Sequence, residues 1–320
     1  MQRASPRNQF LSTVIANSPL CREHYRLVLR APRALRFPPT EPGQFIQISC
    51  RDVATDYALE REIEWGTGAD SEHAPELRAP VALLRRPFSL AGRRDTAEGV
   101  ELDIIHRVVG VGTDWLSRLR DDDGVSILGP LGNTFRLPTP DQTAVLVGGG
   151  VGIPPMLYLA ESLAGRRAVA FCGALRRDLL PLTITADASS AGEPTSSIEE
   201  FARHGIPSVL TTDDGSFGFR GFVTQALERH LDAHRDAGHV IYTCGPELMM
   251  KRVADIAAAR GIECQIAVER AMACGMGTCQ SCCIKVAKPD PSQPPLPGSD
   301  WCYRLACTDG PVFRGSELLW

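Results

Sequence analysis

The order of apolar and polar residues along the chain changes near residue 140. Before this point, short apolar or alternating runs are separated by turn residues, a pattern typical of the strands of a small antiparallel barrel. The runs cover residues 25–29, 44–49, 88–90, 102–108 and 125–128. One helix is predicted among them, over residues 113–120, because Thr113 is suited to the N-cap position and an apolar stripe follows it.

After residue 143, short apolar runs with the length of strands alternate with longer helical patterns. The predicted strands are residues 144–147, 168–172 and 240–244, and the predicted helices are residues 154–164, 223–234 and 246–260. This alternation predicts a parallel sheet with helices on both faces. The small polar residues of segment 185–195 predict a loop.

Beyond residue 261 the chain is first rich in cysteine and then, over residues 289–297, rich in proline. No helical pattern there is long enough to build a core, so a bound ligand has to stabilise this segment. The whole chain, at 320 residues, is also long for one hydrophobic core. The sequence therefore predicts a multidomain protein with an antiparallel β-barrel domain over 1–140, an α/β parallel-sheet domain over 141–262 and a small C-terminal domain over 263–320.

The charge of the chain excludes some classes of partner. A formal net charge of −4 gives no basic face for nucleic acid. Eight Asp and Glu residues against three Arg make segment 51–80 strongly acidic, and its simplest interpretation is a solvated loop.

The first ten residues lack the apolar run of a secretory signal, and glycines and prolines interrupt the most apolar window, 143–160. We expect a cytoplasmic protein that does not span a membrane.

The cysteines of the C-terminal segment have the spacing of metal ligands. Cys274, Cys279 and Cys282 form the C-x4-C-x2-C pattern that is typical of plant-type [2Fe–2S] ferredoxins. Thiolates also bind zinc, but zinc sites usually combine two C-x2-C pairs, and this segment has one. The spacing therefore favours an iron–sulfur cluster, with a four-thiolate zinc site as the alternative.

The fourth ligand has two candidates, Cys302 and Cys307. They are five positions apart, an odd offset, so in an extended segment they face opposite sides and only one reaches the cluster. The Gly-Pro turn beside Cys307 favours this residue. Five other cysteines are interpreted as small buried hydrophobic residues: Cys21, Cys50, Cys172, Cys264 and Cys283.

Two further groups of residues are candidates for cofactor binding in the barrel. The first begins a predicted strand, and the second ends in a glycine and a threonine at a predicted helix N-terminus, where backbone N–H groups are free to bind phosphate. These residues are Arg86, Pro87, Phe88, Ser89, Ile105, His106, Arg107, Gly112 and Thr113.

In the α/β segment, two glycine-containing turns follow predicted strands. One lies between a strand and a helix that begins with proline, which is the context of a nucleotide-binding turn, although it lacks the usual G-x-G-x-x-G spacing. A tight strand-to-helix turn without a ligand is the alternative. The second turn lies at the carboxyl edge of the sheet, where open sheets bind ligands. The residues of the two turns are Gly148, Gly149, Gly150, Gly152, Cys244, Gly245 and Pro246.

Taken together, these motifs resemble the ferredoxin reductase superfamily, and most closely the electron-transfer subunits of NAD-dependent dihydroorotate dehydrogenase B. In that family, segments corresponding to 86–89, 105–107, 112–113 and 129–133 build the flavin site, and a C-G-P turn corresponding to 244–246 lies near the nicotinamide. The cluster loop corresponds to 269–282 and ends in a segment matching 307–313. This sequence departs from the family at His106, where tyrosine is usual, at Thr134, where glycine is usual, and in its longer acidic stretch.

The resemblance implies a ferredoxin-NADP reductase-like fold and an oxidoreductase subunit of pyrimidine biosynthesis that uses FAD, a [2Fe–2S] cluster and NAD. It implies that Arg86 and Arg107 contact flavin phosphate and that Ser89 lies near the isoalloxazine ring. It assigns the cluster to Cys274, Cys279, Cys282 and Cys307. The implied partner is a flavin-containing catalytic subunit that oxidises dihydroorotate, in a hetero-oligomer of the heterotetramer type.

The three cofactors form a chemically consistent set. Nicotinamide exchanges two electrons as a hydride, a [2Fe–2S] cluster accepts one electron at a time, and flavin does both. Alternatives are a related subunit of an NADPH:ferredoxin oxidoreductase, a sulfide dehydrogenase or a hydrogenase, in which Arg176 and Arg177 are candidates for binding a 2′-phosphate. An alternative from another class is a non-redox interaction module that binds zinc.

Overall fold

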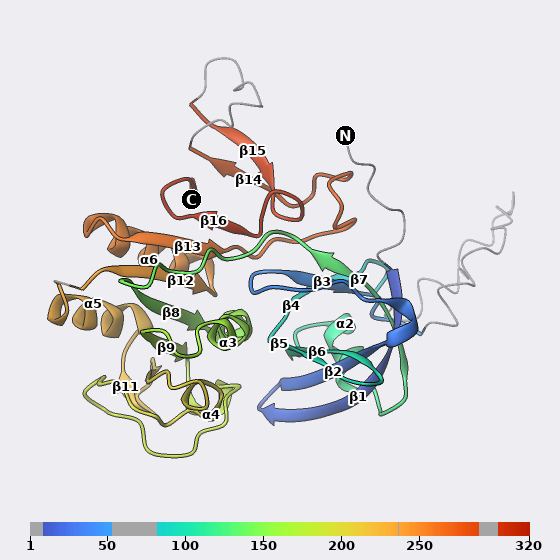
Figure 1. Cartoon of the computed structure of the whole chain (residues 1–320), viewed down its shortest axis with the longest axis horizontal. Helices are drawn as coiled ribbons and strands as arrows, with labels where there is room; N and C mark the ends of the chain where they lie inside the picture. Colours follow the sequence, from blue (N-terminus) through green and yellow to red (C-terminus); the bar gives the residue numbers. More distant parts are fainter. Residues whose placement is uncertain (1–8, 53–81, 236, 288–299) are drawn as a thin grey trace, which may run out of the picture.

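The computed structural model describes residues 9–52, 82–235, 237–287 and 300–320. The acidic stretch 51–80, apart from Arg51 and Asp52, and the proline-rich segment 289–297 lie outside the described residues. Two large sheets lie side by side, and the C-terminal segment lies against both of them (Figure 1).

The first sheet is a curved antiparallel sheet in the order β4-β3-β7-β1-β2-β6-β5. Its inward side chains form one core, to which a short helix contributes Leu116. This arrangement confirms the predicted antiparallel architecture of the N-terminal half. Its elements are β1 (Gln9–Cys21), β2 (His24–Pro32), the 3-10 turn η1 (Arg33–Leu35), β3 (Phe45–Ile48), β4 (Arg86–Ser89), β5 (Gly92–Asp95), β6 (Gly99–Arg107), α2 (Val111–Ser117) and β7 (Gly124–Leu131).

The structure differs from the predicted barrel in three places. The short strand β5 was not predicted, because its sequence, Gly-Arg-Arg-Asp, has no apolar side chain. The long strand β1 was not predicted, because the outer half of this strand is partly exposed and carries polar residues and Pro19, so its apolar alternation is weak. The helix α2 begins at Val111 rather than at Thr113, which places Gly112 and Thr113 inside its first turn.

The second sheet has the order β11-β10-β9-β8-β12-β13-β16, and its strands are parallel except for β16 at one edge. The predicted strands and helices of this half are confirmed to within two residues at their ends. The elements are β8 (Thr143–Gly149), η5 (Gly150–Gly152), α3 (Ile153–Ser162), β9 (Ala168–Ala174), η6 (Arg177–Leu179), α4 (Glu199–Ala202), β10 (Ser208–Thr212), β11 (Phe219–Arg220), α5 (Val223–Ala233), β12 (His239–Cys244), α6 (Glu247–Ala259) and β13 (Glu263–Ala267). Residues 185–195 contain no helix or strand, as predicted, apart from a single bridge at Thr195.

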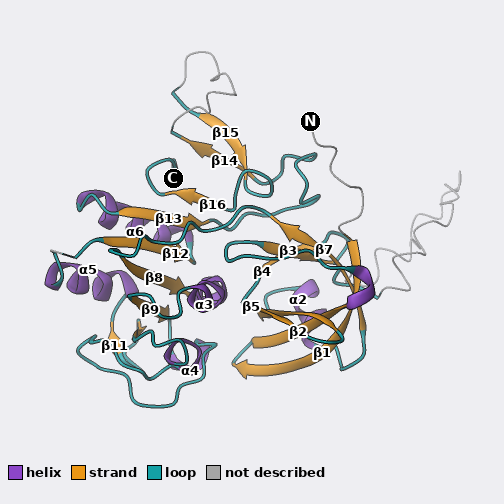
Figure 2. Cartoon of the chain, viewed as in Figure 1, coloured by secondary structure: helices purple, strands orange, loops and turns teal. Residues whose placement is uncertain are grey.

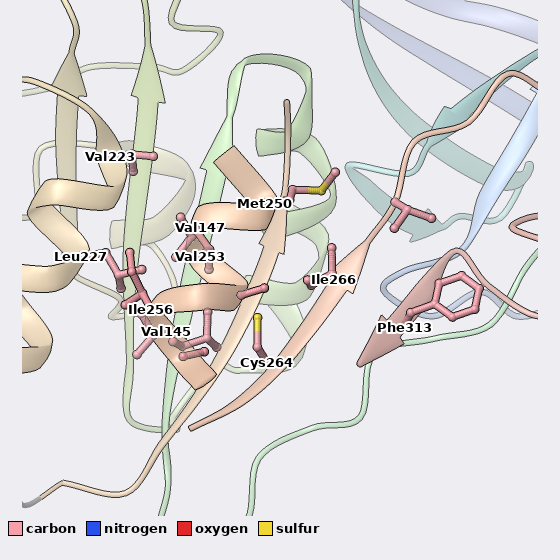
Figure 3. Close-up of a cluster of buried hydrophobic side chains, with 14 of the residues drawn as sticks. Val145, Val147, Val223, Leu227, Met250, Val253, Ile256, Cys264, Ile266 and Phe313 are labelled. Carbon is pink, nitrogen blue, oxygen red and sulfur yellow. The ribbon is translucent and has the colours of Figure 1, made fainter. Parts of the chain in front are cut away.

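Helices cover both faces of this sheet (Figure 2). On one face, α5 and α6 pack their apolar side chains on β8 and β13, with Leu227 and Val253 among the buried contacts (Figure 3). On the other face, α3 packs on Leu146 and Tyr242. Because successive side chains of a strand point to opposite faces, β8 supplies both cores. This layering confirms the predicted α/β class.

The segment after residue 262 contributes to two sheets. Strand β13 and strand β16 (Val312–Arg314) belong to the second large sheet, whereas β14 (Cys283–Val286) and β15 (Cys302–Leu305) form a separate antiparallel hairpin. The loop between β13 and β14 lies against the first sheet, where Gly275 approaches the β3 residue Gln47 (Figure 1). The cysteine-rich segment is therefore in contact with both halves of the chain.

Candidate cofactor-binding sites

The two glycine-containing turns of the second sheet lie directly against each other. Strands β8 and β12 are parallel neighbours, and Gly148 pairs with Cys244 at their carboxyl ends. A Cβ atom on Gly152 would lie 2.2 Å from the carbonyl oxygen of Cys244 and 2.4 Å from the backbone nitrogen of Gly245. Only glycine fits such a close approach of two backbones.

The same turns pack against the start of α6. A Cβ atom on Gly149 would lie 2.6 Å from the sulfur of Met249 and 3.1 Å from Pro246. Pro154 and Pro155 occupy the first turn of α3 and leave it with fewer N–H donors for a phosphate than an ordinary helix N-terminus has. The structure thus brings the two predicted turns into direct contact at the carboxyl edge of the sheet, with Gly150 facing open space.

In the barrel, the start of β4 and the start of α2 meet around Cys50. A Cβ atom on Gly112 would lie 3.3 Å from the Cβ atom of Cys50, and the positive charge of Arg86 acts on the Cys50 thiol. Burial nevertheless raises the pKa of this thiol to about 12. The first N–H groups of α2 have no partner within the helix. Arg86 and the start of α2 therefore combine a positive charge with free donors, which suits a phosphate group.

Thr113 has a structural role at this helix start. Its hydroxyl oxygen accepts hydrogen bonds from the backbone N–H groups of Val109, at 2.9 Å, and Gly110, at 3.2 Å. The hydroxyl is therefore engaged within the turn, and it is the backbone of α2 that is open to a ligand.

His106 lies in a small aromatic group near the end of the barrel. Its ring stacks on Tyr25 with centroids 5.8 Å apart and meets the edge of Phe88 at 6.1 Å. The side chain is buried, and neither ring nitrogen has a hydrogen-bond partner among the described residues. Burial, with a smaller effect of His24, lowers the pKa of His106 to about 4, so this histidine is neutral at pH 7. Its unpartnered nitrogens are suited to a polar group of a bound cofactor.

The other predicted barrel residues contact different parts of the chain. Ile105 is buried in the core of the second sheet, at the contact between the two halves of the chain. Arg107 donates two hydrogen bonds to the carboxylate of Glu23, at 3.0 and 2.8 Å, so contact with a phosphate requires this ion pair to open. On β4, Pro87 and Ser89 are the cross-strand partners of Gln47 and Phe45.

The predicted cluster loop has backbone N–H groups turned towards sulfur. The sulfur of Cys274 accepts hydrogen bonds from the backbone nitrogens of Met276, at 3.5 Å, and Cys279, at 3.4 Å. The loop bends through Gly275 and Gly277, whose φ angles are +71° and +84°. Hydrogen bonds, chiefly with Ser281, lower the pKa of the exposed Cys279 thiol to about 6, which favours the thiolate form that binds iron.

Cys282 and Cys307 lie together on the buried side of the loop. Burial and a hydrogen bond with the Cys282 thiol raise the pKa of Cys307 to about 11, and Cys274 also acts on it. Cys302 is buried in β15, where it pairs with Val286 of the hairpin. Cys283 is exposed, so the expectation that it is buried is wrong, because it is an outward-facing residue of the edge of β14.

These contacts fit a bound [2Fe–2S] cluster better than isolated thiols. The backbone N–H of Cys279 donates to the sulfur of Cys274, and the thiol of Cys307 is hydrogen-bonded to that of Cys282 and interacts electrostatically with Cys274. In the described segments, no group of three His, Cys, Asp or Glu side chains is arranged around a single metal position.

Sequence reasoning did not find two residues that connect the cluster segment to the barrel. Asn133 follows β7, and its side chain donates to the carbonyl oxygens of Asp309, at 3.1 Å, and Val312, at 2.9 Å, and accepts from the backbone N–H of Val312, at 2.8 Å. The resemblance placed this turn in the flavin site, whereas its side chain holds the segment after Cys307. Gln47, the second residue, lies against Gly275; its isolated position in an apolar strand carried no sequence signal.

No helix in the described part of the chain is long and apolar enough to cross a membrane.

The fold and the three candidate sites define a ferredoxin-reductase-type electron-transfer protein with an added iron–sulfur segment. A family model described as the iron-sulfur cluster binding domain of dihydroorotate dehydrogenase B matches residues 269–319, which include all four predicted ligands. The chain belongs to the family of electron-transfer subunits of dihydroorotate dehydrogenase B (NAD(+)). This confirms the family, the fold class and the oxidoreductase character predicted from sequence.

The membership rests on relatives that match nearly the whole chain. The electron transfer subunit of dihydroorotate dehydrogenase B (NAD(+)) from Geobacillus thermodenitrificans is 31% identical over 309 residues, covering 96% of this chain and 97% of the relative. The protein of the same name from Desulforamulus reducens is 30% identical over 283 residues, covering 87% of each chain. That from Geobacillus kaustophilus is 37% identical over 240 residues, covering 74% and 80%.

Solved structures support the same fold. The structure described as the NADH-dependent reduced ferredoxin-NADP oxidoreductase, a study of flavin-based electron bifurcation, superposes with a TM-score of 0.68 at 25% identity, covering 100% of this chain and 92% of the other. Ferredoxin-NADP+ reductase from Plasmodium falciparum superposes with a TM-score of 0.52 at 14% identity, covering 82% and 95%, which supports the fold alone.

Proposed function

We propose that this chain passes electrons between a dihydroorotate-oxidising flavoprotein and NAD+, through a [2Fe–2S] cluster and FAD, in pyrimidine biosynthesis. The observation that carries this proposal is the position of β3. One edge of β3 pairs with the predicted flavin strand β4, and its Gln47 lies against Gly275 of the predicted cluster loop. A single strand thus separates the two candidate redox sites. Flavin can accept two electrons from nicotinamide or give them to it, and can exchange single electrons with the cluster.

The proposed cluster ligands are Cys274, Cys279, Cys282 and Cys307. The contacts of Cys307 with Cys282 and Cys274 support it over Cys302, which pairs within the β14–β15 hairpin. The family match to an iron–sulfur domain supports a cluster over zinc.

The proposed flavin site uses the backbone of the α2 start and the charge of Arg86 for the diphosphate. Phe88, Ser89 and His106 line the approach to the ring system, and Arg107 joins the site if its ion pair with Glu23 opens. The proposed nicotinamide site is the carboxyl edge of the sheet where the turn at Gly152 contacts the turn at Gly245.

We propose the domain division 1–140, 141–262 and 263–320 for the FAD, NAD and cluster domains. The separate sheets support the first boundary. Strands β13 and β16 connect the cluster domain to the NAD domain, and Asn133 connects it to the end of the barrel. The cluster domain is therefore held in a fixed position against both neighbours, as a relay requires.

NAD rather than NADP is the proposed nucleotide. Arg176 and Arg177, the candidates for binding a 2′-phosphate, follow β9 and already have partners: Arg176 pairs with Asp178, and Arg177 lies over the ring of Phe217. Asp213 and Asp214 follow the neighbouring strand β10 and add negative charge at the same edge of the sheet. Acidic residues at this edge suit a free ribose hydroxyl and repel a 2′-phosphate.

Steady-state kinetics with NADH and NADPH test this assignment. A strong preference for NADPH contradicts it, and it would favour the second candidate, a subunit of a ferredoxin oxidoreductase. The structural similarity to the NADH-dependent reduced ferredoxin-NADP oxidoreductase is the observation that supports this second candidate.

The proposed partner is a catalytic dihydroorotate dehydrogenase subunit in a hetero-oligomer, with a heterotetramer as the proposed form. The relatives are themselves named electron transfer subunits. Cys279 and Met276 at the tip of the cluster loop are exposed, which leaves this edge of the cluster site open to another protein. Co-purification from the native host tests the partner, and recovery of the chain without any dihydroorotate-oxidising subunit contradicts it.

We place the protein in the cytoplasm. None of the eleven cysteines forms a disulfide, which is the pattern expected in a reducing compartment. Fractionation of the native host followed by detection of the chain tests this placement, and recovery in an extracytoplasmic fraction contradicts it.

A further inference from the structure

Gln47 is a polar side chain in an otherwise apolar strand, and it is fully buried. Its side chain has an exposed fraction of 0%. Neither the amide nitrogen nor the amide oxygen has a hydrogen-bond partner in the described part of the chain. An unpartnered buried amide is costly, so its retention at this position indicates that something else engages it.

The amide of Gln47 faces the predicted cluster loop. A Cβ atom on Gly275 would lie 2.6 Å from the amide oxygen of Gln47 and 3.0 Å from its amide nitrogen. Gly275 directly follows Cys274, whose sulfur already accepts two backbone hydrogen bonds. The side chain of Gln47 thus ends beside the first predicted ligand of the cluster.

The surroundings of Gln47 make this contact specific. Ile46 and Ile48 point into the barrel core, so Gln47 points out of the barrel on the same face of β3 as Phe45. Phe45 belongs to the buried cluster that contains Cys282 and Cys307. On the flavin side, the cross-strand partner of Gln47 is Pro87. Gln47 therefore lies between the strand of the predicted flavin site and the loop of the predicted cluster.

We propose that Gln47 is a positioning residue for the cluster: its amide N–H donates a hydrogen bond to a sulfur of the [2Fe–2S] cluster at the Cys274 end. This inference rests on the proposed function, because it needs the cluster in this loop. Reduction adds negative charge to the cluster, and an N–H donor to sulfur stabilises that charge. The hydrogen bond therefore raises the reduction potential of the cluster and stabilises its reduced state.

A structural role for Gln47 without the cluster predicts protein partners for its amide. The other buried glutamine, Gln265, has them: its oxygen accepts from the backbone N–H of Arg136 at 2.8 Å, and its nitrogen donates to the carbonyl oxygen of Arg136 at 3.0 Å. Gln47 has no equivalent bonds among the described residues. This contrast supports a ligand of the protein, rather than the backbone, as the acceptor.

The test compares Gln47→Met with Gln265→Met in the holoprotein. Methionine keeps the length of glutamine and removes the N–H donor. Each variant is first assayed for flavin, iron and sulfide content, and the cluster midpoint potential is then measured by redox titration followed by EPR. We expect Gln47→Met to keep its cluster with a midpoint shifted to more negative potential, and Gln265→Met to keep the midpoint of the parent protein. An unshifted midpoint in fully loaded Gln47→Met overturns the inference.

A second measurement serves if Gln47→Met does not fold or loses its cluster. The reduced cluster is studied by pulsed EPR in protein made by cell-free synthesis with side-chain-15N glutamine. The exposed loop residue Gln280 is replaced by asparagine, which tolerates its φ of +57°. We expect a 15N coupling from the remaining glutamine amide near the cluster, and the absence of this coupling overturns the inference.

The two proposals fail in different ways. If the proposed function is wrong, NADH does not reduce the cluster of the parent protein, or the chain has no cluster. If only the inference is wrong, the cluster is present and is reduced by NADH, but neither its midpoint nor its nitrogen coupling depends on Gln47.

Discussion

Replacing Gly152 by alanine tests whether the two turns of the second sheet form the nicotinamide site. The added Cβ atom would lie 2.2 Å from the carbonyl oxygen of Cys244 and 2.4 Å from the nitrogen of Gly245. Both neighbours are backbone atoms, so relief requires the turns to separate by roughly 1 Å, to the shortest distance at which such atoms normally pack.

The expected effect follows from this displacement. Overpacking of this kind costs about 1–3 kcal/mol of the free energy of unfolding. A displacement of roughly 1 Å in a positioned site reduces the reaction rate by about 100-fold. We therefore expect Gly152→Ala to fold with its flavin and cluster, and to lose about 100-fold in the rate at which NADH reduces the flavin.

The assay is anaerobic stopped-flow absorbance of flavin bleaching by NADH, with dithionite as a reductant that does not need the nucleotide site. Gly165→Ala, between α3 and β9, is the matched control outside the proposed site. A Cβ atom on Gly165 meets no atom within 4 Å, and its φ of +78° costs about 1–2 kcal/mol without a clash. We expect Gly165→Ala to keep the NADH rate within a few-fold of the parent protein.

Two results would refute this account of the nucleotide site. The first is a folded Gly152→Ala protein that is reduced by NADH at the rate of the parent. The second is an equal loss of rate in both glycine variants, since this would show that the contact with Cys244 has no specific role.

Three further predictions concern the cluster, the clamp at Asn133 and the barrel. Cys307→Ser is expected to lose the cluster and keep flavin, as seen by iron content and visible absorbance; if Cys302→Ser does this instead, the fourth ligand is wrong. Asn133→Ala removes three hydrogen bonds to the segment after Cys307 and should lower the free energy of unfolding by about 2–3 kcal/mol, measured in urea; an unchanged value contradicts the clamp. Burial lowers the pKa of His106 to about 4 in the folded protein, so the unfolded chain binds a proton at this histidine more tightly. Flavin-free protein should therefore lose roughly 2 kcal/mol of its free energy of unfolding between pH 7 and about pH 4.5. His106→Phe should remove this part of the pH dependence, and an unchanged pH profile contradicts it.

Sequence patterns were sufficient to predict the helices and strands whose apolar residues all face a buried core. The helices α3, α5 and α6 and the strands β8, β9 and β12 were predicted closely, since their apolar residues are buried in continuous cores. Strand β1 was missed because half of it is exposed, and α2 was shifted because its N-cap is Gly110, not the threonine that the sequence favoured.

The candidate sites could be predicted where the spacing of residues along the sequence is typical of one kind of binding site. The C-x4-C-x2-C pattern located the cluster loop, and the two glycine-containing turns were found separately. That the turns touch depends on the pairing of β8 with β12, which no local pattern contains. Gln47 and Asn133 are single polar residues whose partners lie far away in sequence, near Gly275 and Val312, so their roles required the tertiary structure.

Anaerobic titration of the purified chain with NADH, followed by visible absorbance and EPR together, tests the electron relay most directly. We expect NADH to bleach the flavin and to produce the EPR signal of a reduced [2Fe–2S] cluster in the same protein. A flavin that bleaches while an intact cluster stays oxidised, or a colourless protein that contains zinc, would contradict it.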